Sequence, residues 1–198
     1  MGVSKAAAAE NRARVLDVAG RLFREKGFNG IGVNDLMKAA GLTRGGFYAT
    51  FESKEDLAVR ASTLALASGV ATLTKVAAES PAFAFIAVVR FYLTKRHRAR
   101  PDLGCPLAAL GADAARAGPA LKAIFAVGLE SHIDLLERIL PDHVVDERRK
   151  KATAAMALLA GALTLSRSVD DNTADRVLES AKIGILTMCG VERPVEHR

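Results

Sequence analysis

Residues 33–50 read VNDLMKAAGLTRGGFYAT, and this stretch decides the fold. It predicts two short helices, 33–40 and 43–50, separated by a tight turn centred on Gly41 and Leu42, which is the pattern of a helix-turn-helix. The apolar residues of the pair are expected to point inward and to pack against the helix that precedes them. The inward positions are Leu36, Ala39, Ala40, Leu42 and Phe47, and their expected partners are Leu16, Leu22 and Phe23.

The second of these helices is expected to turn an unusual surface outward. Two adjacent glycines in eight helical residues cost about 0.8–1 kcal/mol each relative to alanine. Loose packing in a surface turn explains one glycine, but not two beside an arginine and an exposed tyrosine. A helix without side chains can instead approach base edges in the major groove of DNA, which is about 12 Å wide. The outward residues are Thr43, Arg44, Gly45, Gly46, Tyr48 and Thr50.

Chemical type suggests a role for each polar residue near this surface. Arg44 can fork onto guanine O6 and N7 or grip a phosphate, and the sequence leaves both open. Thr43 is first an N-cap, although its methyl group could touch a thymine. Tyr48 offers a hydroxyl at phosphate reach. Lys54 lies in the first turn of the next helix, where a bound phosphate would offset its unfavourable interaction with the helix dipole. Only residues 43–46 are expected to determine which DNA base sequence is bound.

On both sides of this stretch, capping residues and helix breakers divide the chain into further predicted helices. Residues 11–26 carry an apolar stripe that ends at Gly27, and Ser53-Lys54-Glu55-Asp56 opens a long helix to about Glu79. Proline, glycine or aspartate breaks follow near residues 80, 101–106, 117–119, 140 and 169–171. No stretch alternates apolar and polar residues as a strand would, so we predict an all-α protein of about nine helices.

Composition and charge narrow the class of protein. The chain has 198 residues, 50% hydrophobic and 25% charged, which excludes wholesale disorder. Two cysteines are too few for a disulfide framework or a four-thiolate metal site. The net charge is +6, and residues 1–50 carry eight Lys and Arg against four Asp and Glu. That concentration of positive charge is typical of a segment that binds a polyanion.

An enzyme is the opposing class, and the sequence argues against it. Ser131, His132 and Asp134 are close in sequence, but successive helical residues point about 100° apart and form no catalytic triad. There is neither a phosphate-binding glycine loop nor a metal-ligand cluster, so we expect no cofactor and no metal. The N-terminus lacks an apolar signal-peptide core, and the apolar run 152–165 is too short for a bilayer. We therefore expect a soluble, cytoplasmic protein.

Residues 11–57 resemble the N-terminal DNA-binding domain of the TetR family of transcriptional regulators. The likeness runs through GF at 27–28, VNDLMKAAGLTRGGFY at 33–48 and FESKEDL at 51–57. It implies a homodimer, usually a repressor, that binds a palindromic operator and is released by a small molecule. On that basis the three-helix DNA-binding domain spans 8–68 and is joined through the long fourth helix to an α-helical ligand-binding and dimerisation domain at 69–198.

The resemblance also implies roles for individual residues. Phosphates would be contacted at Thr43, Tyr48, Thr50 and Lys54, and bases at Arg44 and Gly45. Two positions depart from the family's pattern. Gly32 stands where Thr or Ser commonly caps the second helix. Thr50 stands where His or Tyr is common, which makes a phosphate contact at that position shorter.

The C-terminal part offers candidates for a dimer interface. The helix at 150–166 is rich in alanine and glycine, and small residues permit close helix packing. With the last helix, at 172–188, it could form a two-fold four-helix interface, the alternative being two core helices of a monomer. Dimerisation matters because two recognition helices must meet half-sites about 34–36 Å apart.

The predicted effector pocket is largely apolar, as the resemblance implies. Its candidate residues are Phe91, Cys105, Phe125, His132 and Leu159. A lone histidine on a helix is more often structural than a ligand. Cys105 lies at the predicted start of a helix, near arginines. Its thiol is either a redox or electrophile sensor or a small buried hydrophobic group. Loss of an oxidant response on Cys105→Ser substitution would decide between the two. A DNA-binding architectural protein without any effector is a further alternative.

Overall fold

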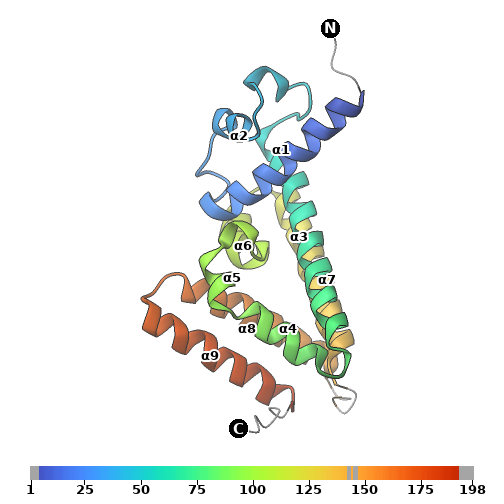
Figure 1. The fold of residues 1–198 in the computed structure, drawn as a ribbon, viewed down its shortest axis with the longest axis vertical. Helices are drawn as coiled ribbons and strands as arrows, with labels where there is room; N and C mark the ends of the chain where they lie inside the picture. The colour runs from blue at the N-terminus through green and yellow to red at the C-terminus, as the bar shows by residue number, and fades with distance from the viewer. Residues whose placement is uncertain (1–4, 142–143, 145–146, 192–198) are drawn as a thin grey trace. The chain divides into compact units, whose positions relative to one another are not determined.

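The computed structural model describes residues 5–141, 144 and 147–191. All regular structure in these residues is helical, which confirms the all-α prediction (Figure 1). The α-helices are α1 (Lys5–Lys26), α2 (Val33–Ala39), α3 (Lys54–Glu79), α4 (Ala84–Tyr92), α5 (Lys95–Ala99), α6 (Pro106–Arg116), α7 (Pro119–Ile139), α8 (Arg148–Ser166) and α9 (Asp171–Met188). Short 3₁₀ turns are η1 (Arg44–Gly46), η2 (Pro81–Phe83) and η3 (Pro101–Leu103).

The helix ends follow the punctuation of the sequence. Gly27, Gly41 and Gly190 follow α1, α2 and α9 with φ values of +75°, +70° and +65°, a region that residues with a Cβ rarely adopt. The N-terminal end of α1 differs from the prediction, because the helix begins at Lys5 rather than Asn11. The four alanines at 6–9 explain the difference, since alanine has the highest helix propensity and extends a helix that is already nucleated.

The predicted second helix of the pair, 43–50, is not an α-helix. Only a 3₁₀ turn forms at Arg44–Gly46, and a hydrogen-bonded turn follows. The backbone N–H of Gly46 donates to the carbonyl of Thr43 at 3.1 Å, and that of Phe47 to the carbonyl of Arg44 at 3.0 Å. Two adjacent glycines account for the missing α-helical turn, because each weakens a helix by about 1 kcal/mol relative to alanine.

The chain divides into two compact units, each with its own packing. Unit 1 comprises Met1–Ser68 and Pro101–Gly128, and unit 2 comprises Gly69–Arg100 and Leu129–Arg198. The boundary at residues 68 and 69 falls inside α3, and residues 101–128 pack with the N-terminal part. The functional division into a DNA-binding domain (8–68) and a ligand-binding and dimerisation domain (69–198) stays a prediction.

The core of unit 1 joins the helix-turn-helix to α1 and to the start of α3. Leu36, Ala40 and Phe47 are buried and Leu42 is half-buried, as predicted, but Ala39 is exposed. Met37 is buried in its place, because α2 buries residues 36, 37 and 40, a stripe one residue away from the one expected. Phe28 lies edge-on to both Phe23 and Phe125, with ring centroids 5.4 and 6.5 Å apart.

Residues 101–128 are attached to the helix-turn-helix side of unit 1 by polar contacts as well. Arg24 of α1 donates from Nε to the carbonyl of Asp102 at 2.9 Å. Burial lowers the pKa of this guanidinium, and the charge of Asp102 opposes that shift. Glu55 of α3 approaches Gly118 closely, because a Cβ added at this glycine would lie 2.6 Å from Oε1. The hydrogen bond from Arg24 therefore ties this segment to α1.

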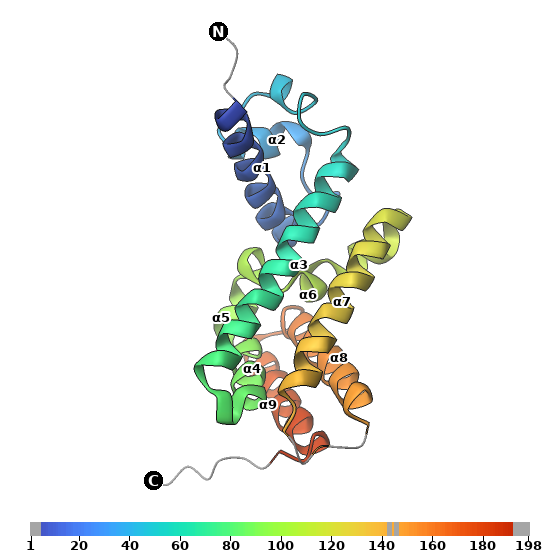
Figure 2. The ribbon, with the colours of Figure 1, turned by 90° about the vertical axis from the view of Figure 1, so that its right-hand side faces the viewer.

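Unit 2 is built on α8, α9 and α4, which pack on one another (Figure 2). Two arginines tie α5 to the end of α8. Arg98 donates to the carbonyl of Ser166 at 2.7 Å, and Arg167 donates in return to the carbonyl of His97 at 2.9 Å. Carbonyls at helix ends lack intrahelical partners, so each arginine closes the C-terminal end of the other's helix.

His97 gives unit 2 a pH-dependent stability. Its ring donates from Nδ1 to the carbonyl of Tyr92 at 2.7 Å and stacks edge-on against the Tyr92 ring. Burial lowers the pKa of His97, and the nearby charge of Arg167 adds to this effect. The unfolded chain, in which histidine titrates near pH 6.5, therefore takes up the proton first as the pH falls.

We expect this stability to be fully present above pH 6.5 and to be lost progressively as the pH falls below it. Urea unfolding between pH 7.5 and 5.5 measures the effect. The fall in the free energy of unfolding should be smaller in a His97→Phe variant than in the original chain, whatever the variant's absolute stability. Equal pH dependences in the two proteins would show that His97 titrates alike in both states.

Among the described residues, α3 is long and apolar enough to span a membrane by length and composition alone. The sequence pattern had indicated only residues 152–165 as an apolar run of interest for a bilayer. A third of the apolar window, 33%, is buried inside the structure, and a core helix passes the same test. Leu57, Ala58, Ala61 and Leu66 of α3 belong to the core of unit 1, which accounts for its hydropathy.

Candidate nucleic-acid interface

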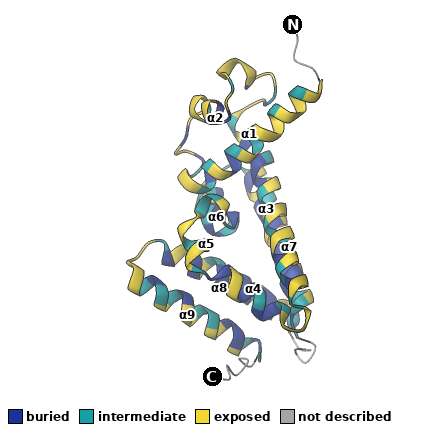
Figure 3. Cartoon of the chain, in the orientation of Figure 1, coloured by how far each residue is buried: buried dark blue, intermediate teal, exposed yellow. Residues whose placement is uncertain are grey.

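The surface predicted to meet DNA is exposed in the structure (Figure 3). Thr43, Arg44, Gly45 and Gly46 are all exposed, and Tyr48 exposes 63% of its surface. Directly beneath them lie the buried side chains Met37, Phe47 and Phe51. The Tyr48 ring stands edge-on to Phe47, with centroids 5.0 Å apart. These buried side chains form an apolar layer, called the buried floor below. It supports an exposed stretch of backbone that carries almost no side chains at Gly45 and Gly46.

The two glycines have no structural reason within the described chain. A Cβ added at Gly45 would meet nothing within 4 Å, and one at Gly46 would meet only Cε of Met37 at 3.8 Å, an ordinary contact. Neither glycine is among the residues of positive φ. Alanine would therefore fit both positions without strain, and the space beside Gly45 is open to a partner.

The two threonines of this surface differ from their predicted roles. Thr43 occupies the N-cap position of η1, but its side chain makes no capping hydrogen bond, contrary to the prediction. The 3₁₀ turn accounts for this, because its first N–H groups are placed differently from those of an α-helix. Thr50 is half-buried, and its hydroxyl donates to the carbonyl of Gly46 at 3.2 Å. Its hydroxyl oxygen can still accept a hydrogen bond.

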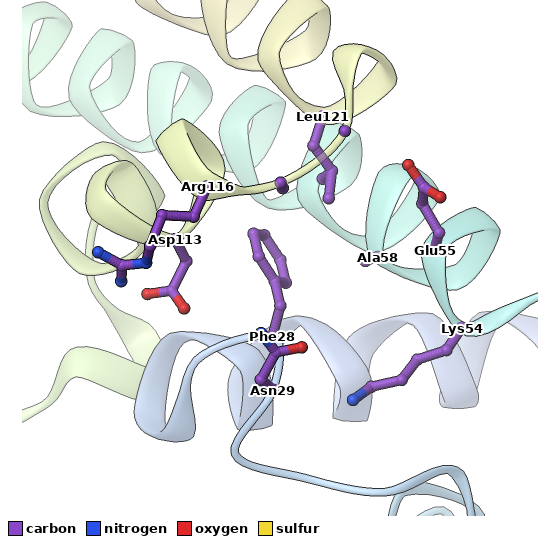
Figure 4. A pocket seen from close by; sticks show the side chains of 10 residues that line it. Phe28, Asn29, Lys54, Glu55, Ala58, Asp113, Arg116 and Leu121 are labelled. Atoms are coloured by element: carbon purple, nitrogen blue, oxygen red, sulfur yellow. The ribbon is translucent and has the colours of Figure 1, made fainter.

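The start of α3 combines a capped helix end with a lysine. The Oγ of Ser53 accepts the N–H of Asp56 at 3.0 Å, and the Asp56 carboxylate accepts the N–H of Glu52 at 3.2 Å, which is a variant of the predicted capping box. A phosphate at this end would meet the backbone N–H groups of Lys54 and Glu55. Lys54 also lines an open pocket of about 280 Å³ (Figure 4).

That pocket is not the effector site predicted from the sequence. Besides Lys54 it is lined by the charged residues Glu55, Asp113 and Arg116 and by the ring of Phe28, all within unit 1. None of the five predicted effector residues lines it. Figure 4 shows Asp113 and Arg116 on one side of Phe28 and Lys54 on the other.

The five predicted effector residues are divided between the two units. Cys105 and Phe125 belong to unit 1, where Phe125 is a member of the hydrophobic core. His132 and Leu159 are buried in unit 2, whereas Phe91 is 44% exposed. The His132 ring packs against Gly69, where a Cβ would lie 3.2 Å from Nε2. A shared effector site for these residues stays a prediction.

Cys105 takes the position that the sequence suggested. It is the N-cap residue of α6, with Pro106 opening the helix, and it is buried with 6% of its surface exposed. Its side chain makes no capping hydrogen bond. Arg24 lies close enough for the two charges to interact. Burial is typical of a small hydrophobe and a neighbouring arginine of a reactive thiol, so both interpretations remain hypotheses.

Sequence reasoning missed two features of this interface. The first is Met37, whose side chain lies beneath Gly46. Leu36 and Met37 are adjacent apolar residues, as Val15 and Leu16 are in α1, and this pattern could have identified Met37 as a core residue. The helical residues 5–10 also went unassigned, because the prediction began this helix at Asn11.

The exposed glycine-bearing turn, the buried floor and α2 together define a helix-turn-helix protein. Comparison with known proteins gives the family. Residues 15–61 match the family described as bacterial regulatory proteins, tetR family. Over 54 residues the chain is 44% identical to the HTH-type transcriptional regulator AcrR of Shigella flexneri, a stretch that covers 27% of this chain and 25% of that protein. Residues 15–61 therefore carry a DNA-binding segment like that of the tetR family of regulators.

Solved structures show the same fold over nearly the whole chain. The reduced form of E. coli NemR superposes with a TM-score of 0.77 at 22% identity, covering 94% of this chain and 99% of that one. A TetR-family regulator from Cytophaga hutchinsonii gives a TM-score of 0.78 at 23% identity, covering 98% and 100%. Because the AcrR match spans only a quarter of that protein's length, the partners and mode of action of this chain are matters for proposal.

Proposed function

We propose that this chain is a repressor that binds a palindromic operator as a homodimer and is released by a small-molecule effector. The observation that carries the DNA-binding part is the exposed glycine pair Gly45-Gly46, with open space beside Gly45, for which the described chain gives no structural reason. In this proposal Arg44 and the backbone at Gly45 read bases. Thr43, Tyr48, Thr50 and Lys54 hold phosphates, and Gly46 lets the backbone approach closely.

An apolar, exposed face of α8 and α9 supports the homodimer. Ala157, Leu158, Gly161 and Leu165 are exposed along one side of α8, a helix without a charged residue from 152 to 166. Leu165 exposes 60% of its surface and Leu158 exposes 42%. On α9, Ile183 and Gly184 are exposed as well, and a Cβ at Gly161 or Gly184 would meet nothing within 4 Å. Such a stripe fits the self-complementary surface of a two-fold dimer.

Release by an effector rests on the family likeness and on the attachment of residues 101–128. The hydrogen bond from Arg24 to the carbonyl of Asp102 ties this segment to α1, so a displacement of residues 101–128 would be transmitted to α1 and the helix-turn-helix packed on it. A cytoplasmic location follows from an operator as partner. The alternative, an architectural protein without effector, predicts an operator affinity that no small molecule changes.

Two substitutions test whether Arg44 reads bases and Lys54 binds phosphates. Arg44→Ala should relax base preference at one position of the selected duplex, at a cost of about 1–3 kcal/mol, if this side chain reads guanine. Lys54→Ala should weaken binding to all duplexes and lower the salt slope by about one. Fluorescence anisotropy on a duplex selected from a random-sequence library, and on unselected duplex, measures both. Equal losses on the two duplexes for both variants would contradict this assignment.

A further inference from the structure

Helix α1 begins ten residues before its first buried residue. None of residues 5–14 is buried, and Val15 is the first that is. The alanines at 6–9 keep this extension helical although no core supports it. Exposed helix of this length contributes little to the stability of unit 1, so its basic side chains call for another explanation.

The extension lies beside the proposed DNA-binding surface. In both Figure 1 and Figure 2 the first turns of α1 lie at the same end of unit 1 as the segment that follows α2. Arg12 is exposed and lies three residues before Val15, the first buried residue of α1. The pKa of Asp56, in the first turn of α3, is lowered chiefly by its hydrogen bond to Arg60, and the charge of Arg12 adds to the shift. Arg12 therefore lies near the helix end that carries Lys54.

The charge of the extension suits a polyanion. It carries Lys5, Arg12 and Arg14 against Glu10 alone, and all four side chains are exposed. Lys5 lies in the first turn of α1, where a cation opposes the helix dipole and an anionic partner would offset that interaction. The match to the family description spans residues 15–61, so the extension lies directly before it.

We propose that the α1 extension, residues 5–14, is a second DNA-contacting element, in which Arg12 binds a backbone phosphate beyond the base pairs that Arg44 reads. This inference rests on the proposed function and deepens it. The contact carries no sequence information, since a phosphate is the same at every base pair. It enlarges the footprint of each protomer on the flanking duplex and raises its affinity.

The test compares Arg12→Ala with Arg21→Ala, a matched control on the same helix. Arg21 is also exposed, is paired with Asp17 at 3.1 Å and lies more than two turns further along. The probe is the duplex that the original protein selects from a random-sequence library, with ten flanking base pairs on each side and without them. On the long duplex, Arg12→Ala should lower the salt slope by about 0.9 per protomer and weaken binding severalfold. Arg21→Ala should match the original protein.

Trimming the flanks should remove the difference between Arg12→Ala and the original protein, because the contacted phosphate is then missing. Equal slopes for Arg12→Ala and the original protein on the long duplex would overturn the inference and leave the proposed function intact. An equal drop in Arg21→Ala would overturn it as well, since the effect would then reflect net charge. Failure of the original protein to bind any duplex would refute the proposed function itself.

Discussion

A Leu165→Arg variant is expected to be monomeric and to lose operator affinity by about 10²–10⁴-fold. The Leu165 side chain is 60% exposed on the apolar face of α8, so a charge there costs little in an isolated protomer. In a two-fold interface the same charge would be buried twice, without a partner. Each monomer would then hold a single half-site and lose the gain in affinity from linking two.

Sedimentation equilibrium and anisotropy on the selected duplex measure the two effects. Leu103→Arg is the matched control, because Leu103 is similarly exposed, at 51%, but lies in η3 of unit 1, outside the proposed interface. The control should stay dimeric, and both variants should keep the helical content of the original protein by circular dichroism. A Leu165→Arg dimer at micromolar concentration, or a monomer that binds the duplex as tightly as the original protein, would contradict the proposed interface.

Local signals in the sequence were sufficient to predict most helix ends. Gly27 and Gly41 stop α1 and α2 because few other residues adopt a positive φ, and Ser53 caps α3 because its hydroxyl can accept a free backbone N–H. The glycine pair at 45–46 favours two features that conflict with each other. It suggested a surface open to DNA, but it also weakened the helix that was expected to carry it, and only a 3₁₀ turn forms.

The features that escaped prediction depend on contacts between distant residues. The hydrogen bond from Arg24 to the carbonyl of Asp102 joins positions 78 residues apart and involves a backbone atom that every residue has. No periodicity therefore reveals that residues 101–128 pack with the N-terminal part. Aromatic composition is equally ambiguous for the effector pocket. Phe125 was chosen as a pocket residue, yet its ring packs in the core of unit 1 beside Phe28.

Substitution of Gly45 should separate folding from DNA binding more completely than any other change at the interface. A Cβ at this position meets nothing within 4 Å, and the backbone is not in the left-handed region. Gly45→Ala should therefore leave the free energy of unfolding unchanged or raise it by about 0.4–1 kcal/mol, chiefly by restricting the unfolded chain. Gly45→Leu should be equally well folded, because the larger side chain points away from the protein.

Binding to the selected duplex should respond in the opposite direction. A side chain at position 45 would hold the backbone away from the base edges and cost the contacts that Arg44 makes there, about 1–3 kcal/mol per half-site. For a dimer on two half-sites we expect a loss of about 10²-fold or more with leucine and a smaller loss with alanine. Gly111→Leu is the matched control, since Gly111 of α6 is also exposed and open. If Gly45→Leu folds normally and binds as tightly as the control, the open space above residues 45 and 46 is not where DNA lies.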